Sequence, residues 1–229
     1  MTRQGASPVR TLLGWMALSA VLGPAAGASG QDLADLDYEH LSFRGFGFDA
    51  GYLWPTRVEP THSLALRIDM GYAGPGLRIV PNLTYWSSSL VSSEVTEFED
   101  RISQLIENQT GSPPSMLNLG TIDWRDIAVG VDAHIVWDSL FDLLTYGGIG
   151  VAAHLLDGSG PAIDGTFIED AFDTVTAGLN LHFGVEYPLT TRFRIYSVAK
   201  YEVMSDLQFF HVRAGWQIMT GPNAPGEER

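Results

Sequence analysis

The chain has 229 residues, of which 45% are hydrophobic and 17% charged, and this length allows one large domain or two small ones. It carries 27 acidic and 13 basic residues, a formal net charge of −14, so it lacks the basic surface that nucleic-acid binding requires. It contains no cysteine, which excludes both a disulfide framework and a lipoprotein anchor.

The first 30 residues have the layout of a secretory signal peptide. Arg3 and Arg10 precede an apolar core at 11–22, and small residues in an Ala-x-Ala pattern follow. The core is too short for a membrane anchor, and a proline follows it closely. We therefore expect a signal peptide at 1–30, followed by a polar N-terminal linker at 31–42.

After the linker, apolar residues occupy every second position over about ten residues at a time. In the first such segment, Phe46, Phe48 and Tyr52 alternate with glycine and aspartate. Side chains of a β-strand point to opposite faces with period two, so each segment predicts a strand with one apolar face. We expect eight strands, at 45–54, 63–72, 77–86, 126–137, 145–155, 175–187, 193–202 and 210–218.

The connection at 87–120 is long and has a different periodicity. Its middle carries apolar residues at helical spacing, namely Val95, Phe98, Ile102, Leu105 and Ile106. This spacing predicts an amphipathic helix at 93–108, with Ser93 or Thr96 as its N-cap.

Several features favour strands that cross a bilayer. Strands of about ten to twelve residues exceed the roughly five or six that are usual in soluble sheets. No segment after residue 30 reaches the roughly 18 to 20 apolar residues of a membrane helix. Aromatic residues gather near the strand ends, as at a membrane interface: Tyr52, Trp54, Tyr72, Tyr85, Trp137, Tyr187 and Tyr201.

The connections between the predicted strands are also typical of a membrane barrel. Those after the second, fourth and sixth strands are short, and those after the first, third and fifth are longer; the connection after the seventh strand is the exception. Within hydrocarbon every backbone polar group must be paired, which a closed barrel achieves. We therefore predict an all-β fold: an eight-stranded antiparallel up-and-down transmembrane β-barrel at 43–219, with a short helix in an outer loop and a polar C-terminal tail at 220–229. A soluble barrel or sandwich is the alternative, because it shows the same alternation.

The chain resembles a known family in this strand pattern, in the segment Tyr146-Gly147-Gly148-Ile149-Gly150-Val151 and in the final strand, which ends Gly215-Trp216-Gln217-Ile218. The family is that of the small eight-stranded outer-membrane barrels of the OmpA and OmpX type, and the resemblance covers about 43–218. It implies an OmpA-like barrel domain in the outer membrane of a Gram-negative bacterium. We expect a monomer in contact with outer-membrane lipid and lipopolysaccharide, with a protein partner at the outer loops left open.

Charged residues share the face that would point into the barrel: Arg44, Arg67, Arg78, Arg192, Arg194, Lys200 and Arg213 with Asp49, Asp69, Asp126, Asp132, Glu186 and Glu202. The interior of an eight-stranded barrel is just wide enough for side chains, so charges confined there must pair. The predicted site is a structural ionic network that plugs the lumen, formed by Arg44, Asp49, Arg67, Asp69, Arg78, Asp132, Glu186, Arg194, Lys200 and Arg213.

Histidine and serine residues are the candidate metal ligands and catalytic groups of the sequence. Four histidines point inward, but they lie on different strands and lack metal-binding spacing: His134, His154, His182 and His211. The close histidine–serine pairs are His40 with Ser42 and His62 with Ser63, both at strand beginnings. We therefore predict no catalytic residue, no metal site and no cofactor.

The sequence favours a structural or interaction role through the extracellular loops. A small porin-like channel is the alternative, and a lipid-modifying barrel enzyme is a less favoured one. Conductance distinguishes the channel from the plugged barrel, and ester hydrolysis distinguishes the enzyme.

Overall fold

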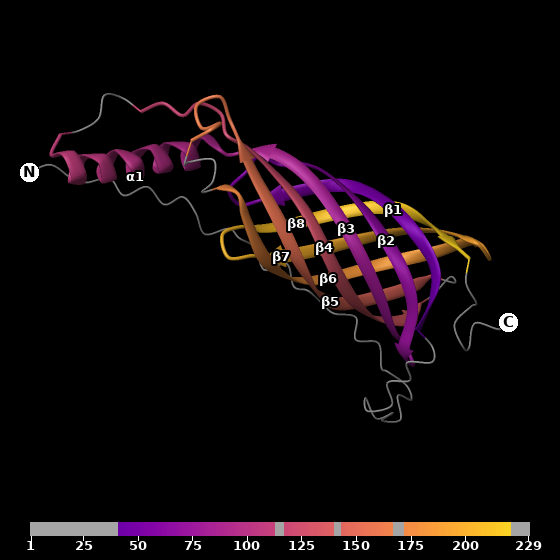
Figure 1. Ribbon diagram of the computed structural model, residues 1–229. Coiled ribbons are helices and arrows are strands. Elements are labelled where there is room, and N and C mark those ends of the chain that lie inside the picture. The colour runs from indigo at the N-terminus through magenta and orange to yellow at the C-terminus, as the bar shows by residue number, and fades with distance from the viewer. Residues whose placement is uncertain (1–40, 113–116, 140–142, 167–171, 221–229) are drawn as a thin grey trace, which may run out of the picture. The chain divides into compact units, whose positions relative to one another are not determined.

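The computed structural model describes residues 41–112, 117–139, 143–166 and 172–220 (Figure 1). The predicted signal peptide, most of the predicted linker and nearly all of the polar tail lie outside the described residues. The elements are β1 (Leu41–Pro55), β2 (Thr61–Gly74), β3 (Leu77–Ser89), α1 (Ser92–Thr110), β4 (Asp123–Asp138), β5 (Leu144–Ser159), β6 (Thr174–Thr190), β7 (Phe193–Val203) and β8 (Gln208–Met219).

The eight strands form one closed barrel. Each strand pairs antiparallel with its neighbours in the chain, and β8 closes the barrel on β1, from Gly45↔Met219 to Pro55↔Phe209. The sheet therefore has no edge, as a structure in hydrocarbon requires. The predicted fold class, an all-β up-and-down barrel of eight strands, is confirmed.

The two ends of the barrel differ in their connections. The β2–β3, β4–β5 and β6–β7 turns lie at one end, here called the inner end. The β1–β2, β3–β4, β5–β6 and β7–β8 connections lie at the other, the outer end, and α1 belongs to the β3–β4 connection. The outer end thus carries the two longest connections, β3–β4 and β5–β6, whereas its β7–β8 connection is about as short as the inner turns.

Helix α1 covers the predicted range but begins differently. Val91 is its N-cap and makes no side-chain cap hydrogen bond, so neither Ser93 nor Thr96 caps it. It ends at Gly111, whose left-handed backbone (φ 75°) lets its N–H donate to the carbonyl of Glu107. Within the part of the chain that the structure describes, α1 included, no helix is both long and apolar enough to cross a membrane.

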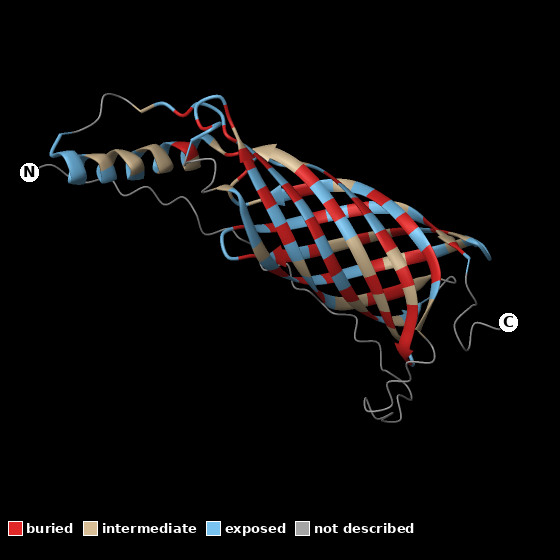
Figure 2. Ribbon diagram, viewed as in Figure 1, coloured by how far each residue is buried: buried red, intermediate tan, exposed pale blue. Residues whose placement is uncertain are grey.

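Burial alternates along most of the barrel wall and produces the chequered pattern of Figure 2. Large apolar side chains face outward around the barrel: Ile149 is 67% exposed and Leu179 66%. Exposure of so much apolar surface would be unfavourable in water and is expected of a face that contacts lipid. Polar and charged side chains face the interior.

Tyr72 departs from the predicted pattern, because it is buried rather than part of the outward aromatic ring. Strands β2 and β3 pair up to Arg67↔Asn82 and resume at Tyr72↔Arg78, so four residues of β2 face three of β3. One extra residue is a β-bulge, and it reverses the direction of the side chains that follow. The interrupted stretch of the β2–β3 ladder contains Gly71 (φ 76°) on β2 and Pro81, which has no N–H to donate, on β3.

The outward face provides a first prediction. Val131 lies near the middle of β4 and is 44% exposed on the lipid side. Val131→Arg should lower the free energy of unfolding from lipid vesicles by about 2 to 4 kcal/mol, the cost of a charge at the bilayer midplane. Leu105→Arg is the control, because Leu105 is exposed on α1 outside the barrel wall and its replacement should change stability by less than about 0.5 kcal/mol. Equal stability of the two variants would contradict the assignment of the lipid face.

Candidate functional site in the barrel lumen

The ten residues of the predicted network all lie inside the barrel. Each is at most 6% exposed, the most exposed being Arg67. Arg192, which the sequence pattern also placed inward, is exposed in the β6–β7 turn. The alternation that assigns faces applies only within a strand, and residue 192 lies outside one.

Glu186 is the centre of the ionic contacts near the inner end. Its Oε1 accepts hydrogen bonds from Arg67 Nη2 at 2.8 Å and Arg78 Nη2 at 2.6 Å, and its Oε2 accepts from Arg78 Nη1 at 3.0 Å. Arg194 Nη1 lies 3.6 Å from Oε2. The bidentate contact with Arg78 is the geometry in which an arginine binds a carboxylate most strongly. One carboxylate from β6 thus binds arginines from β2, β3 and β7.

Two further residues extend this inner cluster. Asp69 lies 3.7 Å from Arg78 Nη1, and its Oδ2 accepts from Gln217 Nε2 at 3.1 Å. Gln217 in turn accepts from Arg67 Nη2. Gln217 was not among the predicted network residues, although its place on the inward face of β8 was a usable signal.

Asp132 and Asp49 hold the cations of the middle of the lumen. Asp132 Oδ2 accepts from Lys200 Nζ at 2.8 Å, and Lys200 is the chain's single lysine. Asp49 Oδ1 lies 2.9 Å from Arg213 Nε, while its Oδ2 accepts from the Tyr196 hydroxyl at 2.6 Å. Every acid of the predicted network therefore contacts at least one cation of the same network.

Nearer the outer end, His154 lies between two carboxylates. Its Nδ1 is 2.8 Å from Asp126 Oδ2 and its Nε2 is 3.2 Å from Glu202 Oε1. Ionised carboxylates only accept hydrogen bonds, so both ring nitrogens act as donors. Neither nitrogen is then available as a general base, and the ring is fully buried.

Glycines make room for these side chains. A Cβ at Gly150 would overlap Asp132 Oδ1, and one at Gly184 would overlap the ring of Tyr146. A Cβ at Gly148 would lie 2.7 Å from His182 Nε2. Gly148, Gly150 and Gly184 thus face bulky lumen residues of the neighbouring strands, which explains two of the three glycines in the segment 146–151.

An apolar cluster, here called the outer cap, closes the outer end. It contains the inward residues at the strand ends and residues from all four outer connections: Leu53, Val58, Trp86, Leu90, Val95, Leu119, Ile122, Trp124, Leu156, Ile163, Met204, Leu207 and Phe209. The sequence analysis did not predict it. The sequence did contain a signal for the outer cap: on the inward face of the strands, charged residues give way to large apolar residues toward the outer end.

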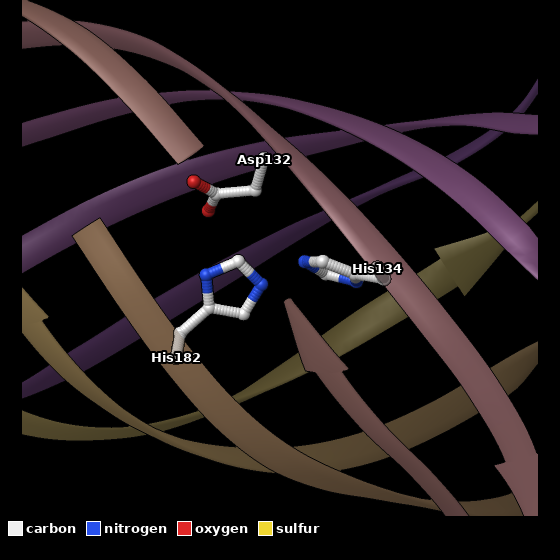
Figure 3. A group of neighbouring side chains, drawn as sticks. All are labelled: Asp132, His134 and His182. Carbon is white, nitrogen blue, oxygen red and sulfur yellow. The ribbon is translucent and has the colours of Figure 1, made fainter. Parts of the chain in front are cut away.

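Asp132, His134 and His182 form a group whose potential ligand atoms all lie within 4.8 Å of one another (Figure 3). Arg78 can only donate, so the hydrogen bond of 3.1 Å from its Nη2 makes His134 Nδ1 an acceptor and places the ring hydrogen on Nε2. Asp132 is already neutralised by Lys200. A metal ion would have to displace these contacts, so the donor set does not suit one.

A small cavity adjoins this group. Its volume is about 20 Å³, and its lining includes Asp49, Arg67, Asp132, His134 and Lys200. A space of this size holds about one water molecule. Such a water could bridge buried polar atoms, but the cavity is too small for a hydrated ion or an organic ligand.

Removing the central carboxylate tests the inner cluster. Glu186→Ala would leave Arg67 and Arg78 buried without their shared counter-ion, which typically costs about 3 to 5 kcal/mol. Asp157→Ala is the control, because Asp157 and Arg125 form a half-exposed cross-strand pair at 3.2 Å and its loss should cost at most about 1 kcal/mol. The measurement is reversible urea unfolding in lipid vesicles. Similar losses for both variants would argue against a buried ionic network.

Two glycines of β5, one facing the lumen and one facing outward, provide a matched pair of variants that test how tightly the lumen is packed. Gly150→Ala should lower the free energy of unfolding by about 1 to 3 kcal/mol, because the added methyl group meets Asp132 and Asn180. Gly147 faces outward, and a methyl group there makes only an ordinary contact with Trp137 at 3.5 Å. Gly147→Ala should therefore be neutral in the same unfolding assay. Equal tolerance at both positions would mean that the lumen is not tightly packed.

Neither a protein-family model nor a curated protein matches the chain. Among solved structures, the chain is similar to surface protein A (NspA) of Neisseria, with a TM-score of 0.53 and 13% identity over 77% of this chain and 97% of that one. It is also similar to Ail, the attachment invasion locus protein of Yersinia pestis, with a TM-score of 0.47 and 11% identity over 79% of this chain and 99% of that one. The likeness to the neisserial protein, at 13% identity, shows the fold alone. The chain has the fold of the small eight-stranded outer-membrane barrels, and its lipid-facing surface makes it a membrane-spanning barrel of that kind.

Proposed function

We propose that this protein is a closed outer-membrane barrel with a structural or interaction role through its extracellular loops, and that it is neither a channel nor an enzyme. The observation that carries the proposal is the double closure of the lumen. Paired charges fill its inner and middle parts, and the outer cap fills its outer end. What remains accessible to other molecules is the lipid-facing wall and the outer loops.

The filled lumen argues against conduction. An ion that entered from the inner end would have to separate Glu186 from its arginines and Asp132 from Lys200, and each separation exposes an unpaired buried charge. It would then meet Trp86, Phe209 and their neighbours in the outer cap, where water is excluded. Hydrophobic constrictions of this kind stop ion flow by dewetting.

The histidines and serines argue against hydrolysis. His62 is exposed, and Ser63, the next residue on the same strand, is 1% exposed inside the barrel. The two side chains therefore lie on opposite faces of the wall and cannot form a base–nucleophile pair. His40, of the other predicted pair, lies outside the described residues. His154 has both ring nitrogens engaged by carboxylates.

The remaining surfaces suggest the partners. The apolar wall is suited to outer-membrane lipid, including the acyl chains of lipopolysaccharide. The outer loops include the partly exposed helix α1, which supports a protein partner at this end. In this proposal the barrel anchors the loops, and the loops carry the specificity.

Conductance tests the proposal directly. Purified protein in a planar lipid bilayer should show no steady ion current, because both barriers must be removed before ions can pass. The double variant Trp86→Ala/Phe209→Ala, which thins only the outer cap, should stay non-conducting because the charge pairs persist. The proposal fails if the native protein gives steady, ion-selective openings.

A further inference from the structure

The apolar residues of α1 form one continuous strip. Val95, Phe98, Ile102 and Leu105 are spaced three, four and three residues apart, the spacing with which helices pack against each other in coiled coils. Because this spacing keeps the side chains on one side of the helix, the strip runs along that side from Val95 to Leu105.

The strip is covered only in its first half. Val95 is buried in the outer cap, and Phe98 and Ile102 pack against it. Leu105, in the next turn, is 60% exposed, and α1 continues for another five residues to Thr110. Figure 2 shows the corresponding change from buried to intermediate and exposed residues along α1.

The first half of α1 is also fixed by polar contacts. Arg57 Nε donates to Glu94 Oε2 at 2.7 Å, and the Leu119 N–H donates to Glu99 Oε1 at 2.7 Å. The ring of Phe98 meets that of Phe172 edge to face, with centroids 5.1 Å apart. The outer cap therefore holds the base of α1 in place, and this fixes the direction in which the second half presents Leu105.

The charge of the outer end indicates what kind of partner can bind the exposed second half of α1. Outside the lumen, the described residues of this end carry eleven acidic side chains, Glu59, Glu94, Glu97, Glu99, Asp100, Glu107, Asp123, Asp157, Asp164, Asp173 and Asp206. They carry three arginines, Arg57, Arg101 and Arg125. Like charges repel, so this surface disfavours a second copy of the chain and the phosphate-rich surface of lipopolysaccharide, and it favours a basic partner.

We propose, resting on the function proposed above, that the outer half of α1 is a docking surface for a basic amphipathic helix of a partner protein. Leu105 and the adjacent Ile106 supply the apolar contact. Acidic residues on the same half of the helix and around it, such as Asp100 and Glu107, attract lysine or arginine residues that flank the partner's apolar strip. The barrel presents the helix, and the partner completes the coiled-coil packing that the outer cap begins.

The test uses the whole barrel in lipid nanodiscs and two synthetic helical peptides of about three heptads, with leucine at the core positions. One peptide has lysine at the flanking positions and the other has glutamate. The lysine peptide should bind measurably by fluorescence anisotropy, more weakly as salt is raised, and the glutamate peptide should not bind. Leu105→Asn should weaken binding by about tenfold or more, because it removes the central apolar contact.

Two variants separate this surface from general attraction. Gln104→Asn changes an exposed residue one position from Leu105 and should leave the affinity unchanged. Asp100→Asn/Glu107→Gln should weaken binding of the lysine peptide and flatten its salt dependence. All variants should retain the heat-dependent gel shift of a closed barrel, because the residues changed are exposed.

Several outcomes would overturn the assignment. Equal binding of both peptides, no binding of the lysine peptide, or an affinity that Leu105→Asn leaves unchanged would each do so. Dimerisation through α1, or binding to lipopolysaccharide vesicles that depends on Leu105, would assign the surface to a different occupant. A barrel that conducts no ions and also binds no peptide would reject the docking surface while leaving the proposed function intact.

Discussion

The barrel interior has room for little more than side chains, and its polar groups must be paired; this constraint governs the structure. In hydrocarbon the backbone must satisfy its own hydrogen bonds, so the sheet closes, and eight strands enclose room only for side chains. Charges placed there lose their solvation and persist only where opposite charges meet them. Glu186 with its arginines, Asp132 with Lys200 and Asp49 with Arg213 follow from this requirement. Lumen-facing glycines of β5 and β6, such as Gly150 and Gly184, leave the space that these side chains occupy.

The composition of the lumen changes along the barrel axis, and the change has a physical reason. Where the wall is surrounded by lipid, the polar interior gives each strand two distinct faces and so determines its register. At the outer end, four connections must be held together. There Leu53, Trp86 and Phe209 face other apolar residues, and the hydrophobic effect provides the stabilisation that charge pairs provide below. The outer cap therefore seals the lumen and also forms the base on which α1 rests.

Much of this fold could be predicted from the sequence, because alternation is a local property. It located eight strands and assigned the inward face of residues such as Arg67 and Lys200, which the structure buries. It failed for Tyr72, because a bulge of one residue at Gly71 reverses the alternation, and for Arg192, because a turn has none. The alternation could not predict which side chains contact one another. The convergence of Arg67, Arg78 and Arg194 on Glu186 depends on strand stagger, and the outer cap depends on how four loops meet.

The division between a sealed barrel and an exposed helix limits where new binding properties can arise. A change in the lumen alters the contacts of several strands at once, since Glu186, Asp132 and Asp49 each contact residues from two or more of them. A change beyond Ile102 on α1 alters a side chain that has no described contact with the outer cap. Stability therefore constrains the lumen strongly and the outer half of α1 weakly. Residues that make few contacts within the fold can change to fit a binding partner without loss of stability. On this chain, the surface with few such contacts combines apolar and acidic residues.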